Sequence, residues 1–175
     1  HDNEAKFHAP ATPEMGNAIA IPTSSANVVE DSEVSNAFHQ LVDAWTTQSN
    51  GDLRMSCIEG SVLDALATLD IQEARLSLLT SGEALAWLTW AGAGGGAHGR
   101  RRGNALGRDA AWWTVAALTG QTSQWPLSNA AFETAADSLQ WFWWDANDPT
   151  TGWNVRLCVH HAERNRSWAF ILTDK

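Results

Sequence analysis

A glycine- and arginine-rich stretch at residues 91–108 limits how this chain can fold, because it separates two apolar segments with helical spacing. It contains seven of the 13 glycines and four of the nine arginines of the chain. The run of glycines within residues 92–96 ends a helix, since glycine is a poor helix former. Alanine and glycine are also frequent in the flanking segments, residues 80–91 and 104–120. We therefore expect two closely packed helices joined by a basic loop.

Residues that cap the first turn mark where helices begin. Thr80-x-x-Glu83 is the full capping-box pattern, and Ser61-x-x-Asp64 is the same pattern with a shorter acidic residue. Other candidate caps are Asp31 or Ser32 for the first helix, Asn104 for the fourth and Ser128 for the fifth. We expect five helices, which cover residues 31–50, 61–69, 80–91, 104–120 and 128–139.

Alternating and aromatic segments predict strands. Residues 153–160 alternate apolar and polar side chains, a hairpin turn follows at 163–166, and residues 168–172 run back. The segment 140–145 is apolar on both faces and too short for another helix, so we expect a central strand there. Further strands are predicted at 53–57 and 75–79, and a short one at Ile19 and Ile21.

The order of these elements predicts an α+β fold. We expect an antiparallel sheet of about four to five strands, with the last three strands consecutive and the helices packed mainly on one face. Pro10, Pro13 and Pro22 exclude a long helix near the start, so residues 1–30 are expected to form an extended lead-in or linker. Residues 31–175 then form a single α+β domain.

The formal net charge of −9 is unevenly distributed along the chain. Residues 1–96 carry −10 and residues 97–175 carry +1. The acidic excess argues against nucleic acid as a partner, whereas the arginine loop can attract a small anionic ligand. No run of 18 apolar residues is present, so we expect no membrane partner. Cys57 and Cys158 form neither a metal motif nor a disulfide framework, which indicates a cytoplasmic protein without metal or cofactor.

The basic loop is the candidate ligand site. Glycine backbone amides, the start of a helix and arginine side chains all favour a negatively charged group, although the loop follows a helix and is not a P-loop. The predicted anion-binding residues are Gly95, Gly96, His98, Arg100, Arg101, Arg102, Asn104 and Arg108. The alternative is a mobile connection whose arginines are solvated or pair with the acidic first half. A predicted interaction surface beside the loop consists of Trp87, Trp90 and Trp112.

The sequence contains no recognisable catalytic set. His98 and Asp109 are weak candidates for acid–base groups, and we assign no catalytic residue. Asp145 and Asp148 lie three residues apart, but the aspartate before Pro149 is better explained by a turn. The pattern Cys158-x-His160 places a thiol and an imidazole on one face of a strand, where structural roles are the simpler interpretation.

Several segments after residue 40 resemble a bacterial family described as a domain of unknown function, number 6183, which is common in actinomycetes. The segments that carry the resemblance are AWTTQSNG at 44–51, residues 86–96, GRDAAW at 107–112, AALTG at 116–120 and residues 144–174. The arginine triplet at 100–102 departs from the family pattern. The resemblance implies that this chain is the C-terminal part of a larger protein, and it implies no activity.

The leading functional hypothesis is a non-enzymatic binding or interaction module that uses the basic loop and the nearby tryptophans. Its expected partner is protein, either an N-terminal half or another chain. An enzyme that acts on a phosphorylated substrate is the alternative, with the arginines as its phosphate site. A structural subunit of a larger assembly is the second alternative. A chain with 11 tryptophans and no tyrosine has more indole surface than a core of this size requires, which favours a binding role.

Overall fold

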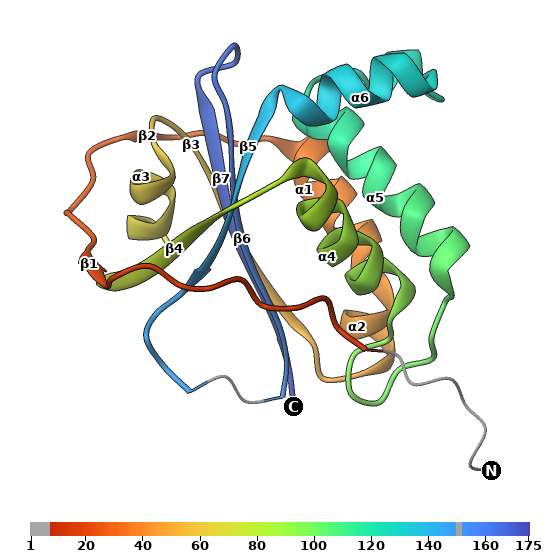
Figure 1. Cartoon of the computed structure of the whole chain (residues 1–175), viewed down its shortest axis with the longest axis horizontal. Helices are drawn as coiled ribbons and strands as arrows, with labels where there is room; N and C mark the ends of the chain where they lie inside the picture. Colours follow the sequence, from red (N-terminus) through yellow and green to blue (C-terminus); the bar gives the residue numbers. More distant parts are fainter. Residues whose placement is uncertain (1–7, 150–151) are drawn as a thin grey trace.

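The computed structural model describes residues 8–149 and 152–175 and confirms the α+β class (Figure 1). The first seven residues of the predicted lead-in, and Thr150 and Thr151 of the predicted turn, lie outside the described residues. The described strands are β1 (Ile19–Ala20), β2 (Asn27–Val28), β3 (Asp52–Glu59), β4 (Glu73–Leu79), β5 (Leu139–Asp145), β6 (Trp153–His161) and β7 (Arg166–Asp174). The helices are α1 (Ser32–Leu41), α2 (Asp43–Gln48), α3 (Val62–Ala67), α4 (Ser81–Ala93), α5 (Asn104–Leu118), α6 (Asn129–Asp137) and a short 3-10 turn, η1 (Thr122–Gln124).

All strands join one antiparallel sheet with the order β1-β4-β5-β6-β7-β3-β2. The five long strands are those that the sequence predicts, and the last three are consecutive in the sheet. Over the described residues the sheet has seven strands instead of four to five, because residues 19–20 and 27–28 each pair with one of the long outer strands.

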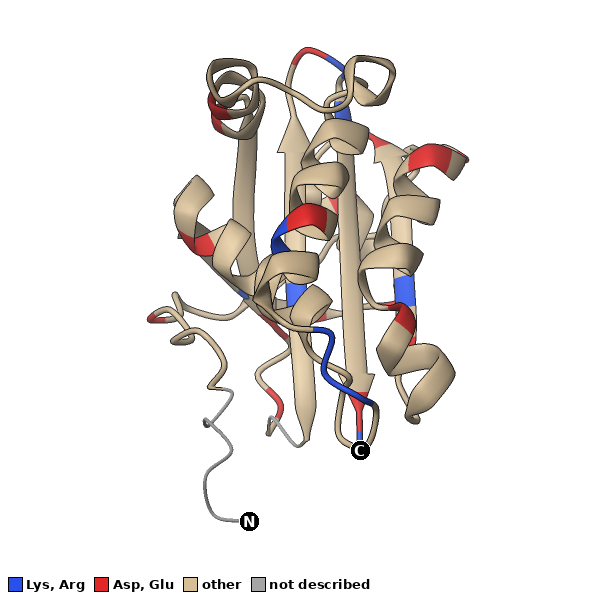
Figure 2. Ribbon diagram, turned by 90° about the vertical axis from the view of Figure 1, so that its right-hand side faces the viewer, with Lys and Arg blue, Asp and Glu red and all other residues tan. Residues whose placement is uncertain are grey.

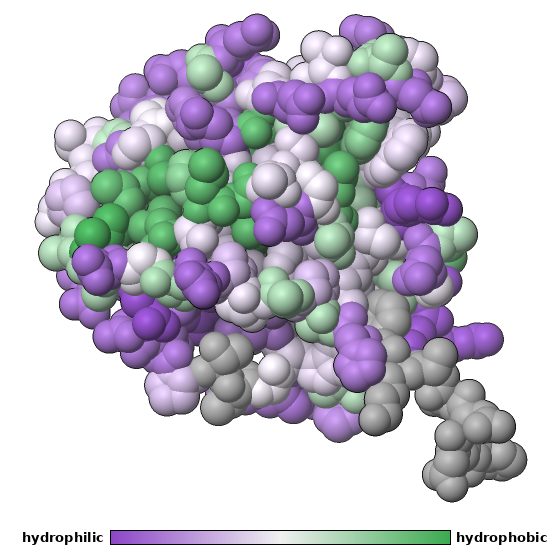
Figure 3. All heavy atoms as spheres, in the orientation of Figure 1, coloured by the Kyte–Doolittle hydropathy of each residue, from purple (hydrophilic) through white to green (hydrophobic). Residues whose placement is uncertain are grey.

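The helices cover the two faces of the sheet unequally (Figure 1). Five of the described helices lie on one face, and α3 alone lies on the other. Adjacent tryptophans of β5 therefore enter different cores: Trp143 packs under the helical layer and Trp144 packs under α3. The α3 face is incompletely covered, and Figure 3 shows apolar surface around α3 and β4. Leu78 is 67% exposed on that side.

The first predicted helix is interrupted. We expected one helix over residues 31–50, but Val42 leaves the helical conformation with φ −106° and ψ 16°, which separates α1 from α2. The break accompanies the burial of Trp45, which is fully buried and donates from Nε1 to the carbonyl of Ala91 at 2.8 Å. A buried indole N–H requires such a partner.

The helical hairpin around the basic loop is packed as closely as its small residues suggest. A Cβ placed on Gly92 would lie 3.2 Å from Cα of Gly107, and one placed on Gly107 would lie 2.4 Å from the carbonyl of Thr89. Larger side chains at these two positions would separate α4 from α5. The hairpin therefore holds the start of α5 directly against the end of α4.

Both predicted capping boxes are present, at Ser61 with Asp64 and at Thr80 with Glu83. The predicted cap at Asn104 is wrong. Asn104 is the first helical residue of α5, and Gly103 occupies the cap position without a side-chain bond. Gly103 has φ +89° and donates to the carbonyl of Ala93, so the chain needs a glycine at the point where it turns back into the helix.

Candidate functional site

The backbone amides of the basic loop are bound to other parts of the protein. The amide of Ala97 donates at 2.7 Å to Oδ2 of Asp174, a carboxylate that is only 1% exposed. Other amides of the loop donate from His98 to Ser49 Oγ, from Arg100 to Gln48 Oε1, and from Arg102 and Gly103 to the carbonyl of Ala93. An anion would have to displace these acceptors, and the buried carboxylate would repel it. The amides hold the loop in place instead of offering a phosphate cradle.

The glycines at 95 and 96 serve the packing of this loop. A Cβ on Gly95 would lie 2.4 Å from the backbone of Gly99, and one on Gly96 would lie 1.9 Å from Oδ2 of Asp174. Figure 2 shows the basic segment of the loop close to the C-terminal end of the chain, where Asp174 holds it.

The arginine side chains do not converge on one point. Arg100 and Arg101 are exposed, and neither lines any of the main cavities of the described protein. Arg102 donates from Nη1 to the carbonyl of Gln40 at 3.0 Å and lines a cavity of about 250 Å³ between α1 and α5. Arg108 lies on α5 and lines a larger groove on another side of that helix.

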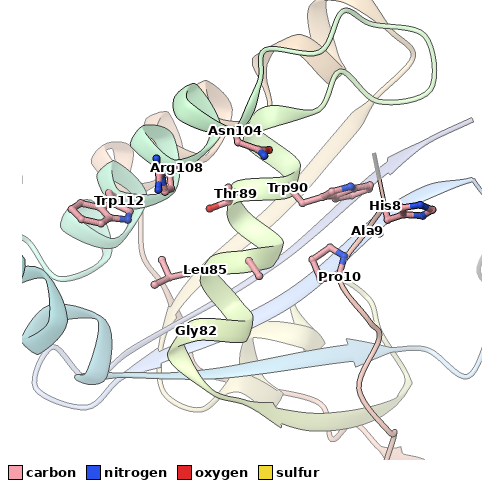
Figure 4. Close-up of a pocket in the computed structure, with 11 residues that line it drawn as sticks. His8, Ala9, Pro10, Gly82, Leu85, Thr89, Trp90, Asn104, Arg108 and Trp112 are labelled. Carbon is pink, nitrogen blue, oxygen red and sulfur yellow. The ribbon is translucent and has the colours of Figure 1, made fainter. Parts of the chain in front are cut away.

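This groove, of about 990 Å³, is larger than the other main cavities described here for residues 8–149 and 152–175 (Figure 4). We call it the α4–α5 groove. Its floor is the outer face of α4, where the side chains are mostly small; one wall comes from α5 and the other from residues 8–10. Lining residues are Gly82, Leu85, Ala86, Thr89 and Trp90 of α4, Asn104, Arg108 and Trp112 of α5, and His8, Ala9 and Pro10.

Four residues that the sequence singles out therefore meet in one place: Trp90, Asn104, Arg108 and Trp112. Arg108 is exposed and has no ion-pair partner among residues 8–149 and 152–175. Trp112 is half-buried and stacks on Phe132 of α6 at 4.1 Å with an interplanar angle of 13°. The groove thus offers one free cation beside an aromatic side chain that is held in place.

The other selected residues lie elsewhere. Trp87 and Trp90 are only 3% and 8% exposed, so most of each ring belongs to the core, and Trp90 is the one of the two that lines the α4–α5 groove. His98 is exposed in the loop and lines none of the main cavities. Asp109 lines the small cavity of Arg102. The structure does not bring these two acid–base candidates into the α4–α5 groove.

A second cavity adjoins the groove at residues 8–10 and has a volume of about 380 Å³. It forms where two neighbouring strands part. The last pair between β5 and β6 is Trp143 with Leu157, although β5 continues to Asp145 and β6 begins at Trp153. We call this cavity the seam pocket.

Five tryptophans line the seam pocket: Trp87, Trp90, Trp143, Trp144 and Trp153. Trp90 stacks on Trp153 at 5.1 Å with an interplanar angle of 12°, and the ring centroids of Trp87 and Trp143 are 4.2 Å apart. The chain segments that supply them are far apart in sequence, so only the folded sheet assembles this wall. The predicted interaction surface includes Trp87 and Trp90 but not the strand residues Trp143, Trp144 and Trp153, because regular strands give no sign in the sequence that they separate from each other.

The carboxylates near the seam pocket are paired with arginines. Asp145 accepts two bonds from Arg75, at 2.8 and 2.7 Å, and Asp148 accepts two from Arg156, at 2.6 and 2.8 Å. Hydrogen bonding to Arg75 lowers the pKa of Asp145, and hydrogen bonding to Arg156 lowers the pKa of Asp148 to about 2. Both groups are therefore ionised at neutral pH and are poor proton donors.

The thiol–imidazole pattern has a structural explanation. Cys158 is fully buried in the core under α3, and burial raises the pKa of its thiol. His160 hydrogen-bonds through Nδ1 to Oγ of Ser167 at 2.9 Å, and Ser167 donates to the carbonyl of Gly60. Burial also raises the pKa of Cys57 to about 11. Neither thiol is prepared for nucleophilic attack.

No group of three or more His, Cys, Asp or Glu side chains within residues 8–149 and 152–175 is placed to hold a metal ion. None of the helices in this part of the chain has the length and apolar character needed to cross a membrane.

The sequence profile of a family of unknown function (DUF6183) matches residues 2–175, so the chain belongs to this family. This confirms the resemblance of the segments after residue 40 and extends it to nearly the whole chain. No curated protein and no solved structure matches the chain.

Proposed function

We propose that this family member is a non-enzymatic binding module that holds a ligand with a carboxylate or phosphate group in the α4–α5 groove. The observation that carries the proposal is Arg108, a cation without a carboxylate partner in the described protein, placed in the α4–α5 groove beside a half-buried indole. In a chain with a formal net charge of −9, such a cation attracts an anion locally, against the average repulsion by the acidic chain.

The lining of the groove suits an anion that is attached to an apolar body. The guanidinium of Arg108 can donate two parallel bonds to a carboxylate or phosphate, and the side chain of Asn104 lies one helical turn earlier on the same wall. Trp112 and Leu85 provide apolar contact for the rest of the ligand. Because Trp112 is already stacked on Phe132, little ordering of this wall is needed on binding.

The groove supports binding better than catalysis. Its volume of about 990 Å³ lies at the upper end of the range of about 300–1,000 Å³ for small-molecule sites. Arg108 and His8 are the titratable residues of its described lining, whereas His98 and Asp109 lie outside it. The enzymatic alternative therefore lacks a paired acid and base in the groove. We also propose a cytoplasmic location, because both cysteines are free and buried, as in a reducing compartment.

Titration calorimetry with phenyl phosphate and indole-3-acetate tests this proposal, and a short glutamate-rich peptide tests whether the anion belongs to a protein. We expect saturable binding of at least one of these probes, weakened about tenfold or more in Arg108→Gln. Arg100→Gln is the matched control, since Arg100 is an exposed arginine outside the groove. Equal losses in the two variants, or no binding of any of the three probes at millimolar concentration, would refute the groove as an anion site.

A further inference from the structure

The seam pocket has the features of a second, independent binding site. The two strands that border it are each paired on their other side: Arg75 of β4 pairs with Asp145 of β5, and Asp174 of β7 pairs with Trp153 of β6. The opening between β5 and β6 is thus held from both sides by the sheet. It leads from the tryptophans of the helical face to Trp144, Asn154 and Arg156, which belong to the α3 face.

Three of the residues that line the pocket carry buried polar atoms without a hydrogen-bond partner in the described protein. They are Nε1 of Trp144, Oδ1 of Asn154 and Nε of Arg156. The first and third are donors and the second is an acceptor. Buried polar groups are almost always satisfied in folded proteins, so this cluster calls for a partner that supplies both kinds of group.

The charges beside the pocket are already balanced. The guanidinium of Arg156 holds Asp148 through both Nη atoms, and Asp145 holds Arg75 in the same bidentate manner. An ion entering the pocket would have to compete with these pairs, whereas a neutral molecule would not. The stacked indoles favour a flat molecule, because planar rings gain most from contact with aromatic side chains.

We propose that the seam pocket binds a neutral, planar ring that carries an amide group, as in a pyrimidine or purine base. The carbonyl of such a ring accepts from the donors of Trp144 and Arg156, and its N–H donates to Oδ1 of Asn154. The ring itself packs against the indoles of Trp143 and Trp153. A volume of about 380 Å³ accommodates a single ring or a fused pair, in contrast to the larger open groove. The two sites adjoin at residues 8–10, but this proposal does not depend on the ligand of the α4–α5 groove.

Uracil and 1,3-dimethyluracil form the decisive pair of probes, because methylation removes the N–H groups and keeps the ring and its carbonyls. We expect uracil to bind saturably, with a change in tryptophan fluorescence, and the dimethyl analogue to bind about tenfold more weakly. The Asn154→Ala variant should lose this preference, since the acceptor for the N–H is gone. Asn36→Ala, which changes an exposed asparagine on α1 outside both sites, should keep it.

If Asn154→Ala folds poorly, a second variant tests the same hydrogen bond. Asn154→Asp retains an acceptor oxygen at the same position, so it should still prefer uracil over the dimethyl analogue. Three outcomes would overturn the proposal: no binding of uracil at millimolar concentration, equal binding of the two probes, or a preference that persists in Asn154→Ala. Each of these can occur while Arg108→Gln still weakens anion binding, so a failure here is distinct from a failure of the proposed function.

Discussion

At the scale of single residues, the contact between Gly96 and Asp174 decides whether the basic loop keeps its form. Gly96 has φ +68°, and a Cβ there would lie 1.9 Å from the carboxylate that receives the amide of Ala97. We predict that Gly96→Ala lowers the free energy of unfolding by about 3 kcal/mol, because a left-handed conformation becomes unfavourable and a buried hydrogen bond is displaced. Urea unfolding followed by circular dichroism measures this loss.

Gly82→Ala is the matched control for this substitution. Gly82 lies in the first turn of α4 and has a helical conformation. A Cβ added at this position would have no neighbouring heavy atom within 4 Å. We expect it to raise stability by about 0.5–1 kcal/mol, since alanine has the higher helix propensity. If Gly96→Ala proved as harmless as Gly82→Ala, Asp174 would not be holding the loop as the structure indicates.

At the scale of elements, the start of α1 is joined to the β6–β7 hairpin by one carboxylate. Asp31 caps the helix through Oδ1, and its Oδ2 accepts from Arg164 and Arg166 at 3.2 and 3.1 Å. The aspartate side chain is 6% exposed. We predict that Asp31→Ala costs about 2–3 kcal/mol of stability, more than the loss of a cap alone, because two partly buried arginines also lose their carboxylate partner.

Ser128→Ala provides the comparison, because Ser128 caps α6 through its side chain without an ion pair in the described structure. We expect this variant to cost about 1 kcal/mol. Thermal or urea unfolding of the two variants separates the contribution of the cap from that of the arginines. A loss in Asp31→Ala no larger than that in Ser128→Ala would show that the arginines contribute nothing at this joint.

The starts of helices were predictable wherever the capping pattern in the sequence agrees with the tertiary structure. Thr80 with Glu83 and Ser61 with Asp64 specify helix starts through bonds made within one turn, so the sequence reveals them directly. The break at Val42 and the cap at Gly103 depend instead on contacts with α4, namely Trp45 to Ala91 and Gly103 to Ala93. Contacts between segments that are far apart in sequence cannot be predicted from the local pattern of either segment.

At the scale of the whole molecule, the candidate sites are products of topology. Arg108 and Trp112 were among the residues that the sequence singled out, because each belongs to the basic stretch or to a tryptophan pair beside it. The sequence hypothesis placed the anion site in the loop. Local sequence does not show that the loop amides donate to Asp174, Ser49 and Gln48, which approach the loop only in the folded protein. The seam pocket could not be predicted at all, because it depends on the residue pair at which β5 and β6 separate.

The response of the whole molecule to acid can be argued from one buried imidazole. His161 ends β6, is 4% exposed, and has a pKa lowered by burial and then by the charge of Arg164. In the unfolded chain its pKa is about 6.5, so below that pH the unfolded state binds the proton more readily than the folded state. The free energy of unfolding must therefore fall as the pH decreases from about 6.5. Urea titrations at several pH values between about 7.5 and 5 measure the slope.

Replacing the imidazole identifies the source of that slope. The glutamine of His161→Gln does not titrate in this range. The stability of this variant should therefore change less between pH 7.5 and pH 5 than that of the unmodified protein, and the difference should correspond to the binding of about one proton. Asp148 acts only in stronger acid: its stabilising pair with Arg156 is complete above about pH 4 and is lost as the pH falls toward 2. If His161→Gln retains the full slope at mild pH, another group, and not the imidazole at the end of β6, couples protonation to unfolding.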